Sequence, residues 1–342
     1  MNSSKRYLMV LVSPDYLSGK GKYVAGSKAP NDVTEILKDE GFVIVPIVRK
    51  SLHKIWGVAE AMVKIWWNLK KLPPDAEVYV QYPMFNISAF SKVAPLFSRF
   101  KSVLIIHDIR TYCQDFMIKH RDKELAVINC FTTVVVHSES MKERLKNDGI
   151  KSRIVVLGVF DYLLRDGLES KKKPNTIMFA GALGKSGFLK ELYQLNFETF
   201  SFHLYGASKP DIVYNDNIIY KGRFLPDDIS EIEAEWGLLW DGSSIESCNG
   251  EHGEYLKLIA PHKLSLYLAC GLKIICWDHS AMAAMVRKKK LGVTISRLDE
   301  IESRIKSLSK EDLKDIEKNV NAIKYEIRHG QMLRKVLKEI MS

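Results

Sequence analysis

Short apolar runs alternate with longer amphipathic stretches along the first half of the chain. The runs are rich in Val and Ile, which is typical of strands buried on both faces of a parallel sheet. They predict strands at Tyr7–Val12, Phe42–Ile47, Glu77–Gln81, Ser102–Ile106, Thr132–Val136 and Arg153–Val156. The stretches between them predict helices at about 31–40, 55–70, 87–98, 119–130 and 139–148. This alternation predicts a doubly wound α/β domain over residues 1–160.

The alternation restarts in the second half. Residues 161–175 are polar and charged and contain a proline, which predicts a linker between two domains. The apolar runs that follow predict strands at Thr176–Ala180, Ser201–Tyr205, Asn217–Tyr220, Trp236–Trp240, Leu272–Trp277 and Gly292–Ile295. Helices are predicted near 185–195, 262–270, 280–289 and 298–307, with a helical tail, 309–342, that can fold back across the first domain. We therefore expect a second Rossmann-like domain at 176–308, facing the first across a ligand-binding cleft.

Composition excludes several classes of protein. With 342 residues, 46% of them hydrophobic, the chain is long enough for two packed cores, so it is not disordered as a whole. The longest uncharged stretches are Val78–Ser91 and Leu125–Ser138, both shorter than the roughly 20 apolar residues of a membrane span. The apolar run Tyr7–Val12 is also too short for a signal peptide, so a cytoplasmic protein is expected. The five cysteines form no C-x-x-C pair, which favours reduced thiols over disulfides or zinc ligation.

Positive charge is concentrated in the first half of the chain. The whole chain carries a net +10, and residues 1–166 hold 25 basic and 17 acidic residues, a net of +8. This excess predicts an anionic partner: the inner membrane surface, a phosphorylated acceptor or nucleic acid. Because no zinc-finger spacing, RNP-type sequence or basic-aromatic stripe is present, nucleic acid is disfavoured.

Two segments of the first domain are candidates for chemistry. The loop over residues 13–30 contains Gly19, Gly21 and Gly26 with Lys28, so backbone amides and a cation can approach a phosphate. Its spacing is neither a dinucleotide fingerprint nor a P-loop, and an ordinary surface loop stays open as the alternative. His107 and Asp108 directly follow an apolar strand, a position suited to proton transfer, although Asp108 can also serve as a helix cap.

The second domain offers two turns that suit an anion. Gly181 to Lys185 connects a predicted strand to a predicted helix, and Pro261-His262-Lys263 opens a helix with no capping side chain before it. Both can also be ordinary helix starts without a ligand. The chain has no D-x-D, H-E-x-x-H or G-x-S-x-G motif, which favours a nucleotide diphosphate held by amides and lysines without a metal.

Eight motifs stand out along the chain. They are Ala25-Gly26-Ser27-Lys28-Ala29 with Asn31-Asp32, Gln81-Tyr82-Pro83-Met84, Ile106-His107-Asp108-Ile109, Phe160-Asp161-Tyr162-Leu163, Ala180-Gly181 with Leu183-Gly184-Lys185, Trp240-Asp241-Gly242, Gly253-Glu254-Tyr255-Leu256-Lys257 and Pro261-His262-Lys263 with Ser265-Leu266-Tyr267-Leu268. In this order they resemble the motifs of bacterial GT-B glycosyltransferases of the β-1,6-galactofuranosyltransferase type and of the related glucosyltransferases of streptococcal adhesins.

The resemblance implies a GT-B fold and a set of UDP-binding residues. In the second domain these are Gly181, Ala182, Lys185, Arg223, Pro261, His262, Lys263, Leu264, Ser265 and Leu266. Gly26, Ser27 and Lys28 would close over the diphosphate from the first domain. Relatives tend to have Asn in place of Ala182, and an acid then Arg where this chain has Arg110-Thr111-Tyr112-Cys113, so the acceptor or the sugar can differ.

We therefore expect an enzyme that transfers galactofuranose or glucose from a UDP-sugar to a sugar hydroxyl of a growing surface glycan, by inversion and without a metal. Asp108 or His107 is the expected base, and the UDP-sugar is a substrate, so no cofactor is expected. A lipid-pyrophosphate-linked acceptor at the inner membrane face fits the basic first domain, and a homo-oligomer stays open. The alternatives are a catalytically silent GT-B subunit and a nucleotide-sugar epimerase or dehydrogenase.

Overall fold

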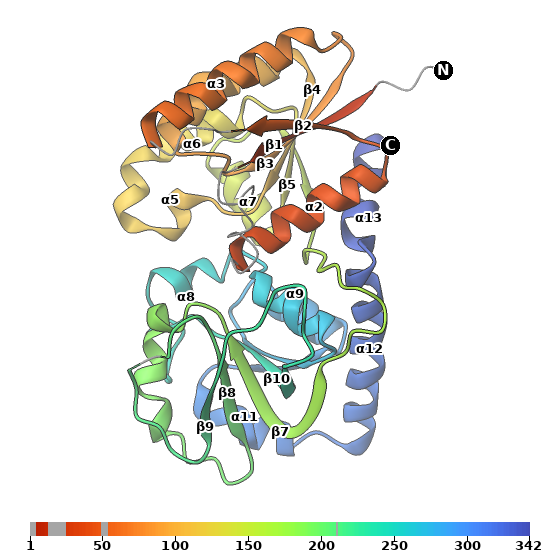
Figure 1. The fold of residues 1–342 in the computed structure, drawn as a ribbon. Coiled ribbons are helices and arrows are strands. Elements are labelled where there is room, and N and C mark those ends of the chain that lie inside the picture. The colour runs from red at the N-terminus through yellow and green to blue at the C-terminus, as the bar shows by residue number, and fades with distance from the viewer. Residues whose placement is uncertain (1–4, 13–24, 49–53, 210) are drawn as a thin grey trace. The chain divides into compact units, whose positions relative to one another are not determined.

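The computed structural model describes residues 5–12, 25–48, 54–209 and 211–342 and divides the chain into two compact units. Residues 1–158 and 333–342 form the N-terminal unit, and residues 159–332 form the C-terminal unit. Each unit contains one six-stranded sheet in which every strand pair is parallel (Figure 1).

The N-terminal sheet has the strand order β2-β1-β3-β4-β5-β6. Its strands are β1 (Arg6–Val12), β2 (Val43–Val48), β3 (Glu77–Tyr82), β4 (Lys101–Ile106), β5 (Thr133–Val136) and β6 (Arg153–Val156). All six predicted strands are present within one residue at each end. The prediction succeeded because the central strands, such as β4 and β5, are almost fully buried and so consist of continuous apolar residues.

Helices flank this sheet, and two of them differ from the prediction. The helices are α2 (Lys28–Asp39), α3 (Lys54–Lys71), α4 (Ile87–Val93), α5 (Arg110–Cys113), α6 (Arg121–Ile128), α7 (Glu139–Asn147) and α13 (Gln331–Met341). The predicted helix 87–98 ends at Val93 and continues as a 3₁₀ turn, because Pro95 has no backbone N–H for the α-helical hydrogen bond. The predicted helix 119–130 starts at Arg121, after a separate 3₁₀ turn.

The C-terminal helix α13 belongs to the N-terminal unit. Its apolar face is buried, and Arg334 Nε donates a hydrogen bond of 2.7 Å to Glu40 at the end of α2. Arg153 Nη2 donates to the Glu339 carbonyl at 2.7 Å. The N-terminal unit is therefore built from two separate stretches of the chain.

The C-terminal sheet has the order β12-β11-β10-β7-β8-β9. Its strands are β7 (Lys171–Ala180), β8 (Ser201–Tyr205), β9 (Ile218–Gly222), β10 (Glu233–Leu239), β11 (Lys273–Trp277) and β12 (Gly292–Ile295). Strand β7 begins inside the predicted linker 161–175, because Lys171 and Lys172 pair with Glu233 and Ala234 of β10. Their side chains are exposed, which gave this part of the strand the composition of a linker.

The predicted helix 185–195 is wrong. Residues 183–194 form three short 3₁₀ turns, whereas the α-helices of this unit are α8 (Glu251–Tyr255), α9 (His262–Ala269), α10 (Ala283–Lys288), α11 (Ile301–Lys306) and α12 (Lys310–Arg328). A Cβ on Gly187 would lie only 3.0 Å from the Ser243 carbonyl oxygen, so the backbone here passes close to a neighbouring loop. Gly184 and Gly187 also disfavour an α-helix in this stretch, because glycine loses more backbone freedom than other residues when a helix forms.

Helix α9 packs directly across strand β10. A Cβ on Gly237 would lie 2.4 Å from ring atoms of Tyr267, so only glycine admits this ring. The buried Tyr267 hydroxyl accepts a hydrogen bond of 3.0 Å from the Ala180 amide at the end of β7. Helix α9 is thereby fixed against the carboxyl ends of two strands, β7 and β10.

Candidate functional site

Gly181, Asp241 and Lys263 meet at the carboxyl edge of the C-terminal sheet. Gly181 follows β7, Asp241 follows β10, and Lys263 lies in the first turn of α9. Lys263 Nζ forms an ion pair with Asp241 Oδ1 and lies 4.3 Å from the ring centroid of Phe179. Gly181 has a φ of +140°, and a Cβ there would lie 3.3 Å from Lys263 Cε, so glycine is favoured by both conformation and space. The structure thus brings two predicted UDP-binding residues, Gly181 and Lys263, together and pairs Lys263 with Asp241, an acid that was not among the predicted site residues.

The turn from Gly181 to Lys185 is a 3₁₀ turn, so it does not present an α-helix N-terminus to an anion. The amides of Leu183 and Lys185 donate within the turn, to Gly181 and Ala182, at 3.1 and 2.9 Å. Ala182 and Lys185 are exposed. A Cβ on Gly206 would lie 2.7 Å from the Gly181 carbonyl oxygen, so β8 ends in a glycine that lets this turn pack closely.

The start of helix α9 lies at this site, beside Lys263. Pro261 is its N-cap residue, not its first helical residue, and no side chain caps the helix. An uncapped α-helix start carries partial positive charge, which adds to that of Lys263. The side chains of Leu264, Ser265 and Leu266 are buried in the core of the unit and hold α9 in place, so a contact of these predicted residues with UDP would use their backbone amides.

Two further predicted residues, His262 and Arg223, lie near this edge. His262 stacks on Tyr162 at 5.2 Å, and the Tyr162 hydroxyl donates to the Pro226 carbonyl at 2.8 Å. Arg223 is exposed and directly follows β9. Since β9 is two strands from β7, Arg223 lies roughly 10 Å along the sheet edge from the Gly181 turn.

His107 of the N-terminal unit is held by Gln81. His107 follows β4, and its Nε2 lies 2.7 Å from Gln81 Oε1, while Gln81 Nε2 donates to the Pro30 carbonyl and to Thr34 Oγ1, both at 3.0 Å. A carbonyl only accepts, so the Gln81 amide has one orientation and His107 Nε2 must be the donor. In neutral His107 the basic lone pair is therefore on Nδ1.

Glu124 organises the loop that follows His107. It is fully buried, and one carboxylate oxygen accepts from the Tyr82 hydroxyl at 2.5 Å while the other accepts from the Thr111 amide at 2.9 Å. Burial and the neighbouring Glu124 raise the pKa of Tyr82. The N-cap of α5 is Ile109, so the alternative role of Asp108 as this helix's N-cap is wrong, and Asp108 is exposed.

The predicted phosphate loop is only partly described. Gly19 and Gly21 lie outside the described residues, and Gly26 and Ser27 are in the 3₁₀ turn before α2. Lys28 is only 5% exposed, and its Nζ pairs with Asp32 Oδ1 at 2.8 Å. Any role of Lys28 at a diphosphate therefore involves sharing its charge with Asp32.

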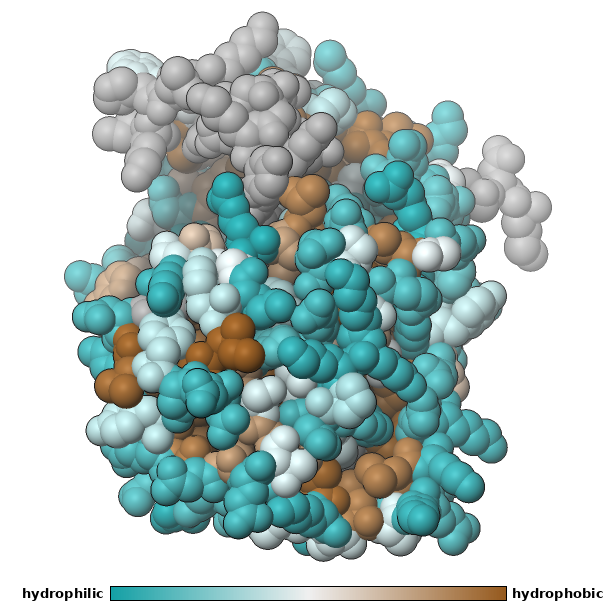
Figure 2. Space-filling model, turned by 60° about the horizontal axis from the view of Figure 1, so that its bottom comes forward, coloured by the Kyte–Doolittle hydropathy of each residue, from teal (hydrophilic) through white to brown (hydrophobic). Residues whose placement is uncertain are grey.

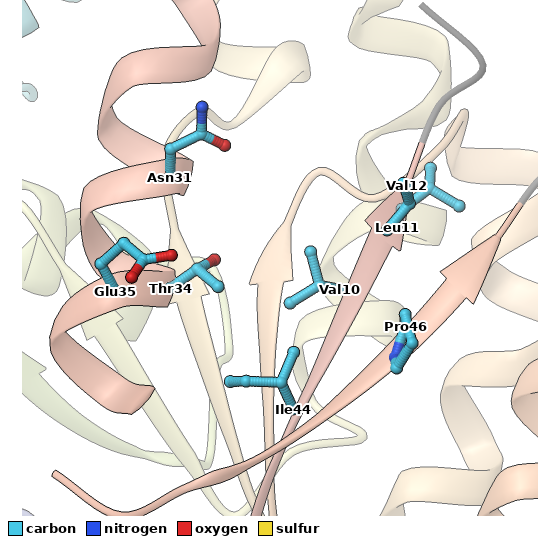
Figure 3. Close-up of a pocket in the computed structure, with 8 residues that line it drawn as sticks. All are labelled: Val10, Leu11, Val12, Asn31, Thr34, Glu35, Ile44 and Pro46. Atoms are coloured by element: carbon cyan, nitrogen blue, oxygen red, sulfur yellow. The ribbon is translucent and has the colours of Figure 1, made fainter. Parts of the chain in front are cut away.

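A pocket of about 200 Å³ lies between α2 and the carboxyl halves of β1 and β2. Asn31, Thr34 and Glu35 of α2 face apolar strand residues across it (Figure 3). Thr34 is also the residue that Gln81 contacts, so the pocket adjoins the hydrogen-bond network of His107.

In the described part of the chain, no group of three or more His, Cys, Asp or Glu residues is placed to bind a metal, and no helix has the length and apolar character of a membrane span. All five cysteines are free, and burial raises the pKa of Cys248, Cys270 and Cys276 to about 12, which makes these thiols poor nucleophiles.

Solved structures with the same architecture are glycosyltransferases of the GT-B class. Anabaena HepE in complex with UDP and glucose aligns with a TM-score of 0.60, at 11% identity, over 99% of this chain and 100% of that chain. Sucrose-phosphate synthase from Thermosynechococcus elongatus gives 0.59, at 11% identity, over 98% and 100%. The predicted GT-B fold is confirmed by these similarities.

Sequence comparisons identify the family. Residues 11–159 match the N-terminal domain of the "Glucosyltransferase 3-like" family, and residues 177–340 match its C-terminal domain. The chain belongs to the glucosyltransferase 3-like family and is a glycosyltransferase, as the resemblance predicted.

Two curated relatives cover nearly the whole chain. The β-1,6-galactofuranosyltransferase WbbI of Escherichia coli (strain K12) is 29% identical over 333 residues, which are 93% of this chain and 94% of the relative. Glucosyltransferase 3 of Streptococcus gordonii is 24% identical over 318 residues, 90% of this chain and 92% of the relative. Both are hexosyltransferases, so the epimerase or dehydrogenase alternative is not supported.

Proposed function

We propose that the enzyme transfers a hexosyl group, galactofuranose or glucose, from a UDP-sugar to a sugar hydroxyl of a growing cell-surface glycan. The observation that carries the proposal is the placement of Lys263 at the uncapped start of α9, beside the Gly181 turn. The relatives named galactofuranosyltransferase and glucosyltransferase support a hexosyl donor, and the complex of HepE with UDP and glucose supports UDP as the carrier.

The C-terminal unit would hold the diphosphate. A diphosphate can accept hydrogen bonds from Lys263 and from the first amides of α9, and the dipole of that helix favours its negative charge. Asp241 forms an ion pair with Lys263, so we infer that Asp241 keeps the Lys263 ammonium in place. When the diphosphate binds, Lys263 would divide its hydrogen bonds between Asp241 and the anion. Lys185 and Arg223, both exposed at the same sheet edge, would add positive charge as the leaving group develops.

The N-terminal unit would supply the base. In a single inverting displacement, the acceptor hydroxyl gives its proton to the base, its oxygen bonds to the anomeric carbon, and the bond to UDP breaks with both electrons leaving on UDP. We favour Nδ1 of His107 as the base, because Gln81 keeps the proton on Nε2 and an imidazole has a pKa near the working pH. Asp108, the exposed neighbour of His107, stays the alternative base.

The reaction is proposed to need no metal and no cofactor beyond its two substrates. The acceptor is proposed to be a lipid-pyrophosphate-linked glycan at the cytoplasmic face of the inner membrane. The positive charge of residues 1–166 supports an anionic surface as the partner of this part of the chain.

A ligand panel tests the proposed donor. Thermal unfolding of the purified protein is measured with UDP, UDP-glucose, UDP-galactose, UDP-galactofuranose, GDP-mannose and NAD, each with and without EDTA. UDP and one UDP-hexose should each raise the melting temperature, because a ligand that binds only the folded state stabilises it. For each ligand the rise should be the same with and without EDTA. Stabilisation by GDP-mannose or NAD alone, or loss of the UDP effect in EDTA, contradicts the proposal.

A further inference from the structure

Helix α3 of the N-terminal unit is apolar on both of its faces. Ala61, Ile65 and Leu69 are buried against the unit. On the opposite face, Trp56 is 71% exposed and Trp67 is 55% exposed, and Val63 between them is 55% exposed. Residues 56, 63 and 67 lie within a narrow stripe of a helix with 3.6 residues per turn, so the exposed apolar residues form one strip, which the partly exposed Glu60 interrupts between Trp56 and Val63. We call Trp56, Val63, Trp66, Trp67 and Lys70 the outer face of α3.

Other helices of the same unit lack such a strip. The exposed positions of α7 are Glu139, Ser140, Glu143, Arg144, Lys146 and Asn147. Those of α2 are Asn31, Glu35, Lys38 and Asp39. Elsewhere in the described residues, exposed large hydrophobic side chains are spread over many elements, and on the face shown in Figure 2 hydrophobic residues form small groups among hydrophilic ones. The outer face of α3 is therefore a local feature that calls for a partner.

The net charge beside this strip is positive. Lys70 Nζ lies 3.8 Å from the ring centroid of Trp66, and both Lys70 and Lys71 are exposed. Residues 54–71 contain four lysines and a single acid, Glu60, which pairs with Lys64 at 2.6 Å. The charge that remains near the strip is positive.

Tryptophan and lysine together suit the surface of an anionic bilayer. Indole rings settle at the boundary between acyl chains and headgroups, where the ring is buried and its N–H stays hydrated. Lysine side chains extend to the phosphates of acidic lipids and are attracted by the negative potential of such a surface. A second copy of α3 is a poorer match, because a symmetric contact would bring lysines of like charge together.

We propose that the outer face of α3 docks the enzyme on a bilayer that contains anionic lipid. Trp56 and Trp67 insert at the headgroup level, and Lys70 and Lys71 contact lipid phosphates. The inference rests on the proposed function only in its purpose, which is to bring the enzyme to a lipid-linked acceptor.

Vesicle binding by the full chain tests this surface. Co-sedimentation is measured with phosphatidylcholine vesicles, with and without phosphatidylglycerol, and tryptophan emission is recorded in each case. We expect binding to the anionic vesicles with a blue shift of emission, and at least a tenfold weaker partition for the double variant Trp56→Ser/Trp67→Ser. Lys70→Glu/Lys71→Glu should weaken binding to anionic vesicles alone, and added salt should do the same.

The matched control is Tyr325→Ser, which changes an exposed aromatic residue of α12 and should leave vesicle binding unchanged. Stabilisation by UDP is measured on every variant, so that loss of membrane binding is separated from loss of the fold or of donor binding. Absence of binding to both vesicle types overturns the proposal. A second outcome also overturns it: sedimentation velocity shows that the wild type is an oligomer and the Trp56→Ser/Trp67→Ser variant is a monomer, while both bind vesicles equally.

Discussion

The carboxyl edges of the two sheets carry different kinds of polar group. At the C-terminal sheet, Lys263 stands at a helix start beside a glycine turn, with one acid as its partner. At the N-terminal sheet, His107 is hydrogen-bonded to the neutral side chain of Gln81. The loop after His107 is hydrogen-bonded to the buried acid Glu124. The first arrangement places a lysine ammonium at the uncapped start of a helix. The second fixes the tautomer of an imidazole.

This difference shows that two units with the same sheet architecture can carry different functional groups. A parallel sheet presents loops at its carboxyl edge in either unit, and the residues on those loops decide which chemistry follows. In this enzyme an edge built of glycine, lysine and helix amides suits a diphosphate. The other edge, built of an oriented histidine, suits a proton transfer.

The largest expected effect comes from removing the cation. Lys263→Ala deletes a charge-assisted hydrogen bond and leaves Asp241 unpaired beside the anion, so the affinity for UDP should fall about 100-fold. Isothermal titration with UDP measures it. In the double variant Lys263→Ala/Asp241→Ala the repulsive acid is gone, and part of the affinity should return. Wild-type affinity in Lys263→Ala would remove this edge from the donor site.

A second histidine sharpens the contrast, because it lies inside the C-terminal sheet. His203 is fully buried in β8, and burial together with Lys173 and Lys221 lowers its pKa to about 4. Its unfolded form binds a proton below about pH 6.5 and its folded form only below about pH 4, so stability is lost as the pH falls through this window. The free energy of unfolding should fall by about 2 kcal/mol between pH 7 and pH 5 because of His203. In the variant His203→Phe this contribution to the pH dependence should be absent.

Urea unfolding at both pH values checks the effect of His203. UDP affinity at pH 7 serves as the control and should be unchanged in His203→Phe, because His203 lies within the sheet and not at its edge. A His203→Phe variant that lost UDP affinity while keeping the wild-type pH dependence of stability would contradict the role assigned to His203.

At the N-terminal edge, Gln81→Glu should shift the pH dependence of the reaction. A carboxylate 2.7 Å from Nε2 favours protonated His107 and raises the pKa of the imidazole. Because His107 acts as a base only when it is neutral, the acidic limb of the pH profile of kcat/KM should move up by about one pH unit. At pH values below that limb, kcat/KM should be about tenfold lower than in the wild type. Gln81→Leu, the control, should lower kcat without that upward movement. An unmoved limb in Gln81→Glu points to Asp108 as the base.

The smallest effect is expected at Glu124. Glu124→Gln keeps a carbonyl oxygen for one backbone amide but loses the charge that strengthens the hydrogen bonds from Tyr82 and Thr111. The free energy of unfolding should drop by about 1 kcal/mol, with UDP affinity unchanged. Chemical denaturation measures it. A larger effect on UDP binding than on stability would contradict the structural role of Glu124.

Sequence predicted the strands well and the partners of the site residues poorly. Buried strands such as β4 are continuous apolar runs, a local signal that needs no knowledge of the fold. Residues 183–194 form 3₁₀ turns in place of the predicted α-helix, and the close approach of Gly187 to Ser243 is a contact between distant parts of the chain that the local pattern does not reveal. His107 and Gln81 are 26 residues apart, and Lys263 and Asp241 are 22 apart, so neither pairing is visible before the strands are placed side by side.

The return of α13 to the N-terminal unit has a consequence for biosynthesis. Leu333, Val336, Leu337 and Ile340 are buried within that unit, although they are translated after the whole of the C-terminal unit. Its first 158 residues therefore leave the ribosome with an apolar surface that α13 covers only later. Chaperones that bind nascent chains are expected to meet that surface, and a truncation before α13 is expected to leave it exposed in the finished protein.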